Sequence, residues 1–170
     1  VYKRQTLRYR NLSLSFLIDV RYGGVMYSGT VSDLRVNGMA EETIGKNRTD
    51  IVDKGVKQDG TENTTAITPY QFWSNNYSSK VSEANVFDAT FVKLREMVLS
   101  YQMPQRWFKN CFIGSLALGV EGRNLWLMKS NVPHIDPETN IFGPSAVGSG
   151  VEYSAIPTTR SWGFNIKLTF

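Results

Sequence analysis

The stretch Arg160–Phe170 reads Arg-Ser-Trp-Gly-Phe-Asn-Ile-Lys-Leu-Thr-Phe. Every second residue is apolar, and the set is Trp162, Phe164, Ile166, Leu168 and Phe170. The residues between them are small or polar, namely Ser161, Gly163, Asn165, Lys167 and Thr169. Successive side chains of a β-strand point to opposite faces, so the pattern predicts a strand with one apolar and one polar side. Such a strand suits a bilayer, which takes roughly 9–11 tilted residues, or the edge of a soluble sheet.

Four further segments are expected to be strands, and three of them show the same alternation over at least part of their length. Their ranges are 3–9, 12–21, 91–103 and 112–129. In the second of them Leu12, Leu14, Phe16 and Ile18 alternate with mostly polar residues. In the fourth, the alternation changes phase around Arg123-Asn124, which predicts a β-bulge. The sequence therefore predicts an all-β, antiparallel arrangement.

The connections between these strands alternate in length. Arg10-Asn11 forms a tight turn and 104–110 a short link, whereas 23–89 and 130–159 are long loops. Short turns at one end and long loops at the other are typical of outer-membrane barrels, and a soluble β-rich domain is the alternative on pattern alone. Inside the first loop we expect a helix over 25–36, a short strand pair within 49–56, and a helix starting at Thr68-Pro69.

The composition excludes several classes of protein. The net charge is +4 and the 19 Lys and Arg residues form no block, which argues against nucleic-acid binding. No apolar run approaches the ~18 residues of a membrane helix. The single cysteine, Cys111, excludes an internal disulfide and a cysteine-based zinc cluster. The chain starts without Met inside a plausible strand and without a signal-peptide pattern, so we expect a processed chain or a fragment.

Several ordered motifs resemble one family. The run Phe91–Pro104, Phe-Val-Lys-Leu-Arg-Glu-Met-Val-Leu-Ser-Tyr-Gln-Met-Pro, closely resembles the F-x-[KR]-L-R-E-x-x-L-S-Y-x-[LM]-P segment of SusC/RagA-type TonB-dependent outer-membrane transporters. Segment 19–24 resembles their D-x-R-x-G-G strand end, 122–125 their G-R-N-L strand, 136–138 their D-P-E loop element and 157–160 their P-x-x-R motif. The motif residues that we single out are Arg95, Glu96, Arg123, Asn124, Asp136, Glu138 and Arg160. The resemblance spans 12–170.

This resemblance implies a fold and a function. It predicts an up-and-down transmembrane barrel of ~22 strands, of which this chain would hold about five, the first incomplete, with long extracellular loops that contain short helices. The plug domain and the TonB box would lie upstream. The expected function is import of oligosaccharides, or of peptides, across the outer membrane of Bacteroidetes-type bacteria, with energy supplied through TonB. A SusD-like surface lipoprotein would cover the extracellular opening of the barrel. Phe170 and Leu168 would belong to the barrel-assembly signal, and 160–170 would pair with 112–129 along one edge.

Charged residues on neighbouring strands form a first group of candidates. Arg95, Glu96, Glu121 and Arg123 are expected to form ion pairs across strands. Acid–base chemistry by Glu96 and Glu121 is the alternative, but nothing else in the sequence supports catalysis. The single His and the single Cys lie in unrelated contexts, so we predict that the chain is not an enzyme.

The long loops carry the remaining candidates. Tyr70, Phe72, Trp73 and Tyr77 either form an aromatic platform for sugar rings or pack the loop onto its neighbours. The stretch 134–138 contains one His, Asp136 and Glu138 and is expected to form a loop turn. A Ca²⁺ site made by Asp136, Glu138 and loop carbonyls is the alternative. No other cofactor is expected. The competing function is a soluble all-β carbohydrate-binding domain, in which the apolar residues of 160–170 would be buried rather than exposed to lipid.

Overall fold

The computed structural model describes residues 1–45, 49–109, 112–141 and 150–170 and divides into two compact units. The first, which we call the sheet unit, comprises Val1–Gly23, Thr90–Asn131 and Thr158–Phe170. The second, which we call the loop unit, comprises Gly24–Ala89 and Val132–Pro157. The only cysteine, Cys111, lies outside the described residues.

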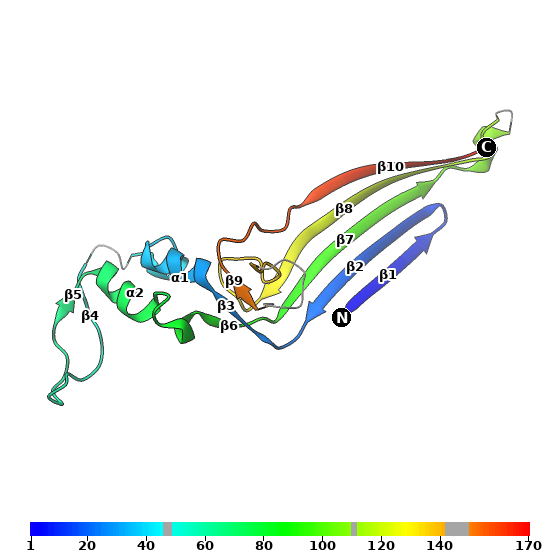
Figure 1. Ribbon diagram of the computed structural model, residues 1–170. Coiled ribbons are helices and arrows are strands. Elements are labelled where there is room, and N and C mark those ends of the chain that lie inside the picture. The colour runs from blue at the N-terminus through cyan, green and yellow to red at the C-terminus, as the bar shows by residue number, and fades with distance from the viewer. Residues whose placement is uncertain (46–48, 110–111, 142–149) are drawn as a thin grey trace. The chain divides into compact units, whose positions relative to one another are not determined.

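The sheet unit is one five-stranded antiparallel sheet in the order β1-β2-β7-β8-β10 (Figure 1). The strands are β1 (Tyr2–Tyr9), β2 (Leu12–Arg21), β7 (Phe91–Gln102), β8 (Ser115–Ser130) and β10 (Ser161–Thr169). All five lie close to the ranges that the alternating pattern predicts. The largest difference is the start of β8, because the link after β7 folds into a 3-10 helix, η3 (Gln105–Phe108), and delays the next strand.

The predicted turn and bulge are both present in the sheet. Tyr9 pairs with Leu12, so Arg10 and Asn11 alone reverse the chain, with Arg10 in the left-handed region at φ 52°. In β8, Asn124 also has a positive φ of 50°, and the register to β7 shifts between Leu94 and Glu96. An extra residue in one strand of a pair causes such a shift, which is the bulge that the phase change predicts.

The loop unit contains two small sheets, two α-helices and two short 3-10 helices among its described residues. One sheet has the order β6-β3-β9, formed by β3 (Val25–Ser28), β6 (Val86–Asp88) and β9 (Val151–Glu152). The other pairs β4 (Ile51–Val52) with β5 (Ala66–Ile67). The helices are α1 (Gly29–Val36), α2 (Pro69–Tyr77), η1 (Glu41–Thr43) and η2 (Ser82–Asn85).

Two expectations for this unit are correct only in part. The helix predicted over 25–36 begins only at Gly29, because Ser28 caps it by accepting a hydrogen bond from the Val31 amide, and 25–28 pair as a strand instead. The strand pair predicted within 49–56 does not form there, since its partner strand, β5, comes from beyond the polar stretch 53–65. A local pattern indicates an extended segment but not its partner.

The start of α2 agrees with the prediction. Thr68 is the N-cap, Pro69 occupies the first turn, and Thr68 and Gln71 exchange the reciprocal hydrogen bonds of a capping box. The core of the loop unit is small and consists of Met26, Ala89 and Val132, with Phe87 and Ile135 packed against it. Among the described residues, none of the helices is both long and apolar enough to cross a membrane.

Candidate functional site

One face of the five-stranded sheet is apolar from edge to edge. The register aligns one row across all five strands, namely Leu7, Leu14, Leu99, Val120 and Phe164. The next row is equally continuous and contains Tyr9, Leu12, Tyr101, Leu118 and Ile166. These side chains remain accessible: Phe164 is 85% exposed and Ile166 68%. A soluble sheet buries such a face under a second layer, and no second layer covers these rows within the part of the chain that the structure describes.

The opposite face of the sheet is small and polar. One row consists of Arg8, Ser13, Ser100, Gly119 and Asn165. The Asn165 side chain lies over Gly119, where any Cβ would collide with it. The neighbouring row contains Thr6, Ser15, Val98, Glu121 and Gly163, and the Thr6 hydroxyl donates to Ser15 at 3.3 Å. The two faces therefore differ in chemistry along the whole width of the sheet.

Ion pairs lie on this polar face, with partners that sequence reasoning missed. Glu96 accepts a hydrogen bond from Arg4 at 2.8 Å across the intervening strand β2. The Nε and Nη2 atoms of Arg95 both donate to one carboxylate oxygen of Asp19, at 3.1 and 2.7 Å. Asp19 is only 4% exposed. A buried carboxylate requires such a partner, and burial in the fold is the signal that the sequence lacks.

The remaining pair among these residues is weaker and lies within one strand, not across strands as predicted. Arg123 lies 3.7 Å from Glu121, two residues earlier on the same strand, and its side chain is 61% exposed. Both Glu96 and Glu121 therefore face arginines, an arrangement that fits structural pairing and offers no support for acid–base chemistry.

The start of β10 is tied to the sheet by motif residues. Asn124, in its left-handed conformation at the bulge, donates from Nδ2 to the carbonyl of Thr159 at 3.0 Å. Lys93, which is 3% exposed, donates from Nζ to the hydroxyl of Thr158 at 2.8 Å. Arg160 follows directly and is exposed. These contacts give Asn124 a positioning role for the strand that begins at Ser161.

The end of β10 contacts the link between β7 and β8. The Phe170 ring stacks on the Phe112 ring at 5.7 Å between centroids and an interplanar angle of 3°. The amide of Gly114 donates to the carbonyl of Thr169 at 2.7 Å. Leu168 pairs with Leu116 on the apolar face and is 46% exposed. Both residues of the expected assembly signal are therefore accessible, and the signal itself stays a prediction.

The aromatic residues around α2 pack mainly against one another. Trp73 is 4% exposed, and its ring lies 5.3 Å from Phe72 and 4.8 Å from Tyr77. The guanidinium of Arg35 lies over the Tyr77 ring at 5.1 Å. Only Tyr70, at 64% exposure, presents its ring freely. This geometry favours the packing role for Trp73, since a sugar ring cannot stack on a buried face.

An ionic cluster joins α1, η1 and the second loop segment. Glu42 accepts from Arg35 Nε at 2.6 Å, and its other oxygen lies 2.6 Å from His134 Nε2. Partial burial raises the pKa of Glu42, but the hydrogen bonds from Arg35 and His134 outweigh it and lower this pKa to about 2. His134 is therefore held by a carboxylate from elsewhere in the chain, a partner that the sequence pattern could not identify.

Asp136 and Glu138 form a local turn. The side chain of Asp136 accepts from the Glu138 amide at 3.2 Å, and its carbonyl accepts from the Thr139 hydroxyl at 2.7 Å. Across residues 1–45, 49–109, 112–141 and 150–170, no group of three or more His, Cys, Asp or Glu side chains is arranged to hold a metal ion. The calcium site remains a prediction.

Glu152 is a buried carboxylate that the sequence analysis did not single out. It is 1% exposed and accepts from the hydroxyls of Ser28, at 2.5 Å, and Thr30, at 2.6 Å. Its bonds join β9 to the N-terminus of α1, which is a structural role. A lone Glu in a loop carries no sequence signal for such burial.

Comparison with known proteins was made for the whole chain. No family model matches it. The TonB-dependent receptor P3 of Formosa agariphila is 23% identical over 168 residues, which cover 96% of this chain and 15% of that receptor. The chain therefore spans only a small part of the length of this relative.

Solved structures of the RagAB peptide importer share the fold. The open-open state superposes with a TM-score of 0.62 at 19% identity, covering 95% of this chain and 16% of the other. A second RagAB peptide transporter structure gives a TM-score of 0.60 at 19% identity, with the same coverage of both chains. These relatives are a receptor and an importer rather than enzymes, in agreement with the prediction of no enzymatic activity.

Proposed function

We infer that this chain, which is related along nearly its whole length to TonB-dependent outer-membrane receptors of the SusC/RagA type, forms part of the wall of an outer-membrane nutrient importer. Its five strands are adjacent members of a transmembrane barrel, and the whole barrel would have ~22 strands. The segment contributes no catalysis; it encloses the transport path and carries two long extracellular connections.

One observation carries this proposal: the sheet has one continuous apolar face and one polar face. In a barrel wall, the apolar rows that contain Phe164 and Ile166 contact lipid, and the face that carries Arg4–Glu96 and Arg95–Asp19 lines the aqueous lumen. Each interior strand satisfies its backbone through its neighbours, as a hydrocarbon environment requires. The outer edges of β1 and β10 would pair with the adjoining wall strands.

The long connections give the loop unit its role. Both leave the sheet at the strand ends opposite the Arg10-Asn11 turn, and in bacterial barrels the long loops are extracellular. The loop unit would therefore meet substrate outside the cell and contact a SusD-like surface lipoprotein. Tyr70, the exposed aromatic residue of the α2 group, is the best candidate for a substrate contact. TonB would act on the upstream part of the receptor.

The substrate is an oligosaccharide or a peptide. The structural relatives are named as peptide importers, which favours peptide, while exposed aromatic rings in an external loop suit sugar faces. Growth of a strain that lacks the receptor gene, with peptide or with glycan as the limiting nutrient, separates the two. A defect on neither class would refute the nutrient-import role.

The barrel-wall geometry is tested by cysteine labelling of the full-length receptor in its native membrane. In a Cys111→Ser background, Phe164→Cys and Ile166→Cys should react poorly with a water-soluble maleimide, and an attached fluorophore should be quenched by brominated lipid. Asn165→Cys, one position away on the polar face, should show the reverse pattern. Equal labelling at 164 and 165 without lipid quenching would favour the soluble carbohydrate-binding domain instead.

A further inference from the structure

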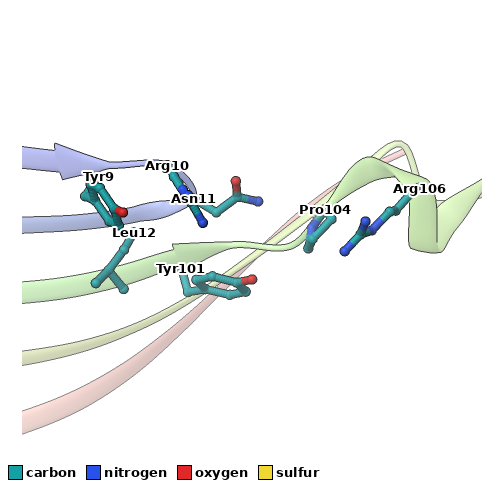
Figure 2. Close-up of a pocket in the computed structure, with 7 residues that line it drawn as sticks. All are labelled: Tyr9, Arg10, Asn11, Leu12, Tyr101, Pro104 and Arg106. Atoms are coloured by element: carbon teal, nitrogen blue, oxygen red, sulfur yellow. The ribbon is translucent and has the colours of Figure 1, made fainter.

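An open hollow of about 600 Å³ lies at the short-turn end of the sheet. Tyr9, Arg10, Asn11 and Leu12 line it from the β1–β2 turn, and Tyr101, Pro104 and Arg106 line it from the end of β7 and the start of η3 (Figure 2). Two arginines and two tyrosines from segments that are far apart in the sequence thus line one hollow. None of the proposed transport roles uses this hollow.

The surroundings of the hollow are basic. The residues that line it include Arg10 and Arg106 and no carboxylate. The sequence contains no Asp or Glu in 1–18, in 97–120 or after 152, so every chain segment that reaches this end of the sheet is free of acidic residues. An anion that enters the hollow therefore meets two guanidinium groups and no acidic side chain among the lining residues.

Contacts hold the arginine of the turn in place. The Gln102 amide donates to the Asn11 carbonyl at 2.8 Å, and the Asn11 side-chain Nδ2 donates to the Gln102 carbonyl at 2.7 Å. These two hydrogen bonds attach the turn to the end of β7. The Arg10 guanidinium lies over the Tyr9 ring, 5.4 Å from its centroid. A site that is ordered before binding loses less entropy when its ligand arrives.

The hollow continues into an apolar groove on the outer face of the sheet. The groove has a volume of about 530 Å³ and shares Leu12 and Tyr101 with the hollow. Its other lining residues are Leu99, Leu118, Val120, Phe164 and Ile166 of the apolar rows, together with Gly119 and Asn165, which lie between these rows along the strands and belong to the polar face. A charged pocket that runs into a long apolar groove matches a ligand with an anionic head and a hydrocarbon tail.

We propose that the hollow and the groove together bind one anionic glycerophospholipid of the inner leaflet. Its phosphate lies between Arg10 and Arg106, which can form charge-assisted, bidentate hydrogen bonds to phosphate oxygens. Tyr9 and Tyr101 lie at the headgroup level, where amphipathic aromatic rings are favoured, and an acyl chain follows the groove. The leaflet assignment rests on the proposed function, because short barrel turns face the periplasm.

The test uses the full-length receptor, stripped of lipid in detergent and titrated with phosphatidylglycerol or phosphatidylethanolamine in native mass spectrometry. Wild type should bind phosphatidylglycerol more tightly than phosphatidylethanolamine. The double variant Arg10→Gln/Arg106→Gln should lose at least about tenfold in affinity for phosphatidylglycerol, the effect of losing one charge-assisted hydrogen bond or more. The matched control is Arg8→Gln, which removes a charge from the same end of the sheet but on its polar face, and it should bind as wild type.

Three results would overturn the proposal. The first is unchanged phosphatidylglycerol affinity in the double variant. The second is equal binding of glycerophosphoglycerol, which lacks acyl chains, because a free anion would then suffice. The third is selective retention of lipopolysaccharide, an outer-leaflet lipid. If the double variant fails to fold, the wild-type protein alone tests the proposal: it should bind phosphatidylglycerol more tightly than phosphatidylethanolamine and glycerophosphoglycerol. The labelling pattern at 164 and 165 is independent of these arginines, so failure of lipid binding is distinguishable from failure of the barrel-wall function.

Discussion

The effect of replacing Phe164 with arginine on the free energy of unfolding tests whether the apolar face of the sheet contacts lipid. Phe164 is 85% exposed and occupies the fourth of nine positions in β10, Ser161–Thr169. From there to the strand end at Thr169 is roughly 17 Å along a tilted strand, or about 12 Å along the membrane normal, so the side chain lies near the middle of a ~25 Å apolar band. An arginine at that depth costs about 2–4 kcal/mol, and we expect Phe164→Arg to destabilise the full-length receptor by about 3 kcal/mol.

The matched control is Asn165→Arg, one residue along the same strand on the polar face. It adds the same charge where water is available, so its cost should stay below about 1 kcal/mol. The assay is equilibrium folding of the full-length receptor from urea into phospholipid vesicles, read by the heat-dependent shift of the folded band in gel electrophoresis. Equal costs at the two positions, or a cost below about 0.5 kcal/mol for Phe164→Arg, would show that the apolar rows do not face lipid.

Three further predictions follow from the loop unit and the polar face. Because the pKa of Glu42 is lowered from 4.5 to about 2, its ion pair stabilises the loop unit above pH 4.5 and loses that effect as the pH falls towards 2. With the side chain 31% exposed, the loss of stability should be about 1–2 kcal/mol. Hydrogen exchange over 29–45, corrected for intrinsic rates, measures this loss, and Glu42→Gln should abolish the pH dependence. Gly29→Ala should destabilise α1 by about 1–3 kcal/mol, because the new methyl group would overlap the Tyr153 ring. Adding Tyr153→Ala to the same receptor should restore the hydrogen-exchange protection of α1. If protection is not restored, the clash is not the cause. Asp19→Asn should cost about 1–3 kcal/mol in the folding assay by leaving the Arg95 guanidinium without its carboxylate, and additivity with Arg95→Gln would contradict the coupling.

The strands, their two-sided chemistry, the tight turn, the bulge and the capped start of α2 could all be predicted from the amino-acid sequence. Each depends on local information. A period of two needs only neighbouring residues, the Arg10-Asn11 turn involves two residues, and the capping box lies within Thr68–Gln71. Ordered motifs added the family resemblance, which the relatives support. The start of α1 was missed because the four residues before it fit a helix as well as a strand, and only pairing with β6 selects the strand.

Which residues meet in space follows from the fold and not from local sequence patterns. Glu96 pairs with Arg4, 92 positions away, and Arg95 with Asp19, 76 positions away, and no spacing rule reaches over such distances. Burial was not readable from the sequence either: Glu152 resembles an ordinary loop residue but is 1% exposed, and only the fold shows that Trp73, which is 4% exposed, packs inward rather than facing solvent. The same holds for the basic hollow, because its lining residues come from the β1–β2 turn and from the end of β7, which lie far apart in the sequence. The physical reason is that charge pairing and burial depend on distances in space, which the fold sets and the order of residues does not.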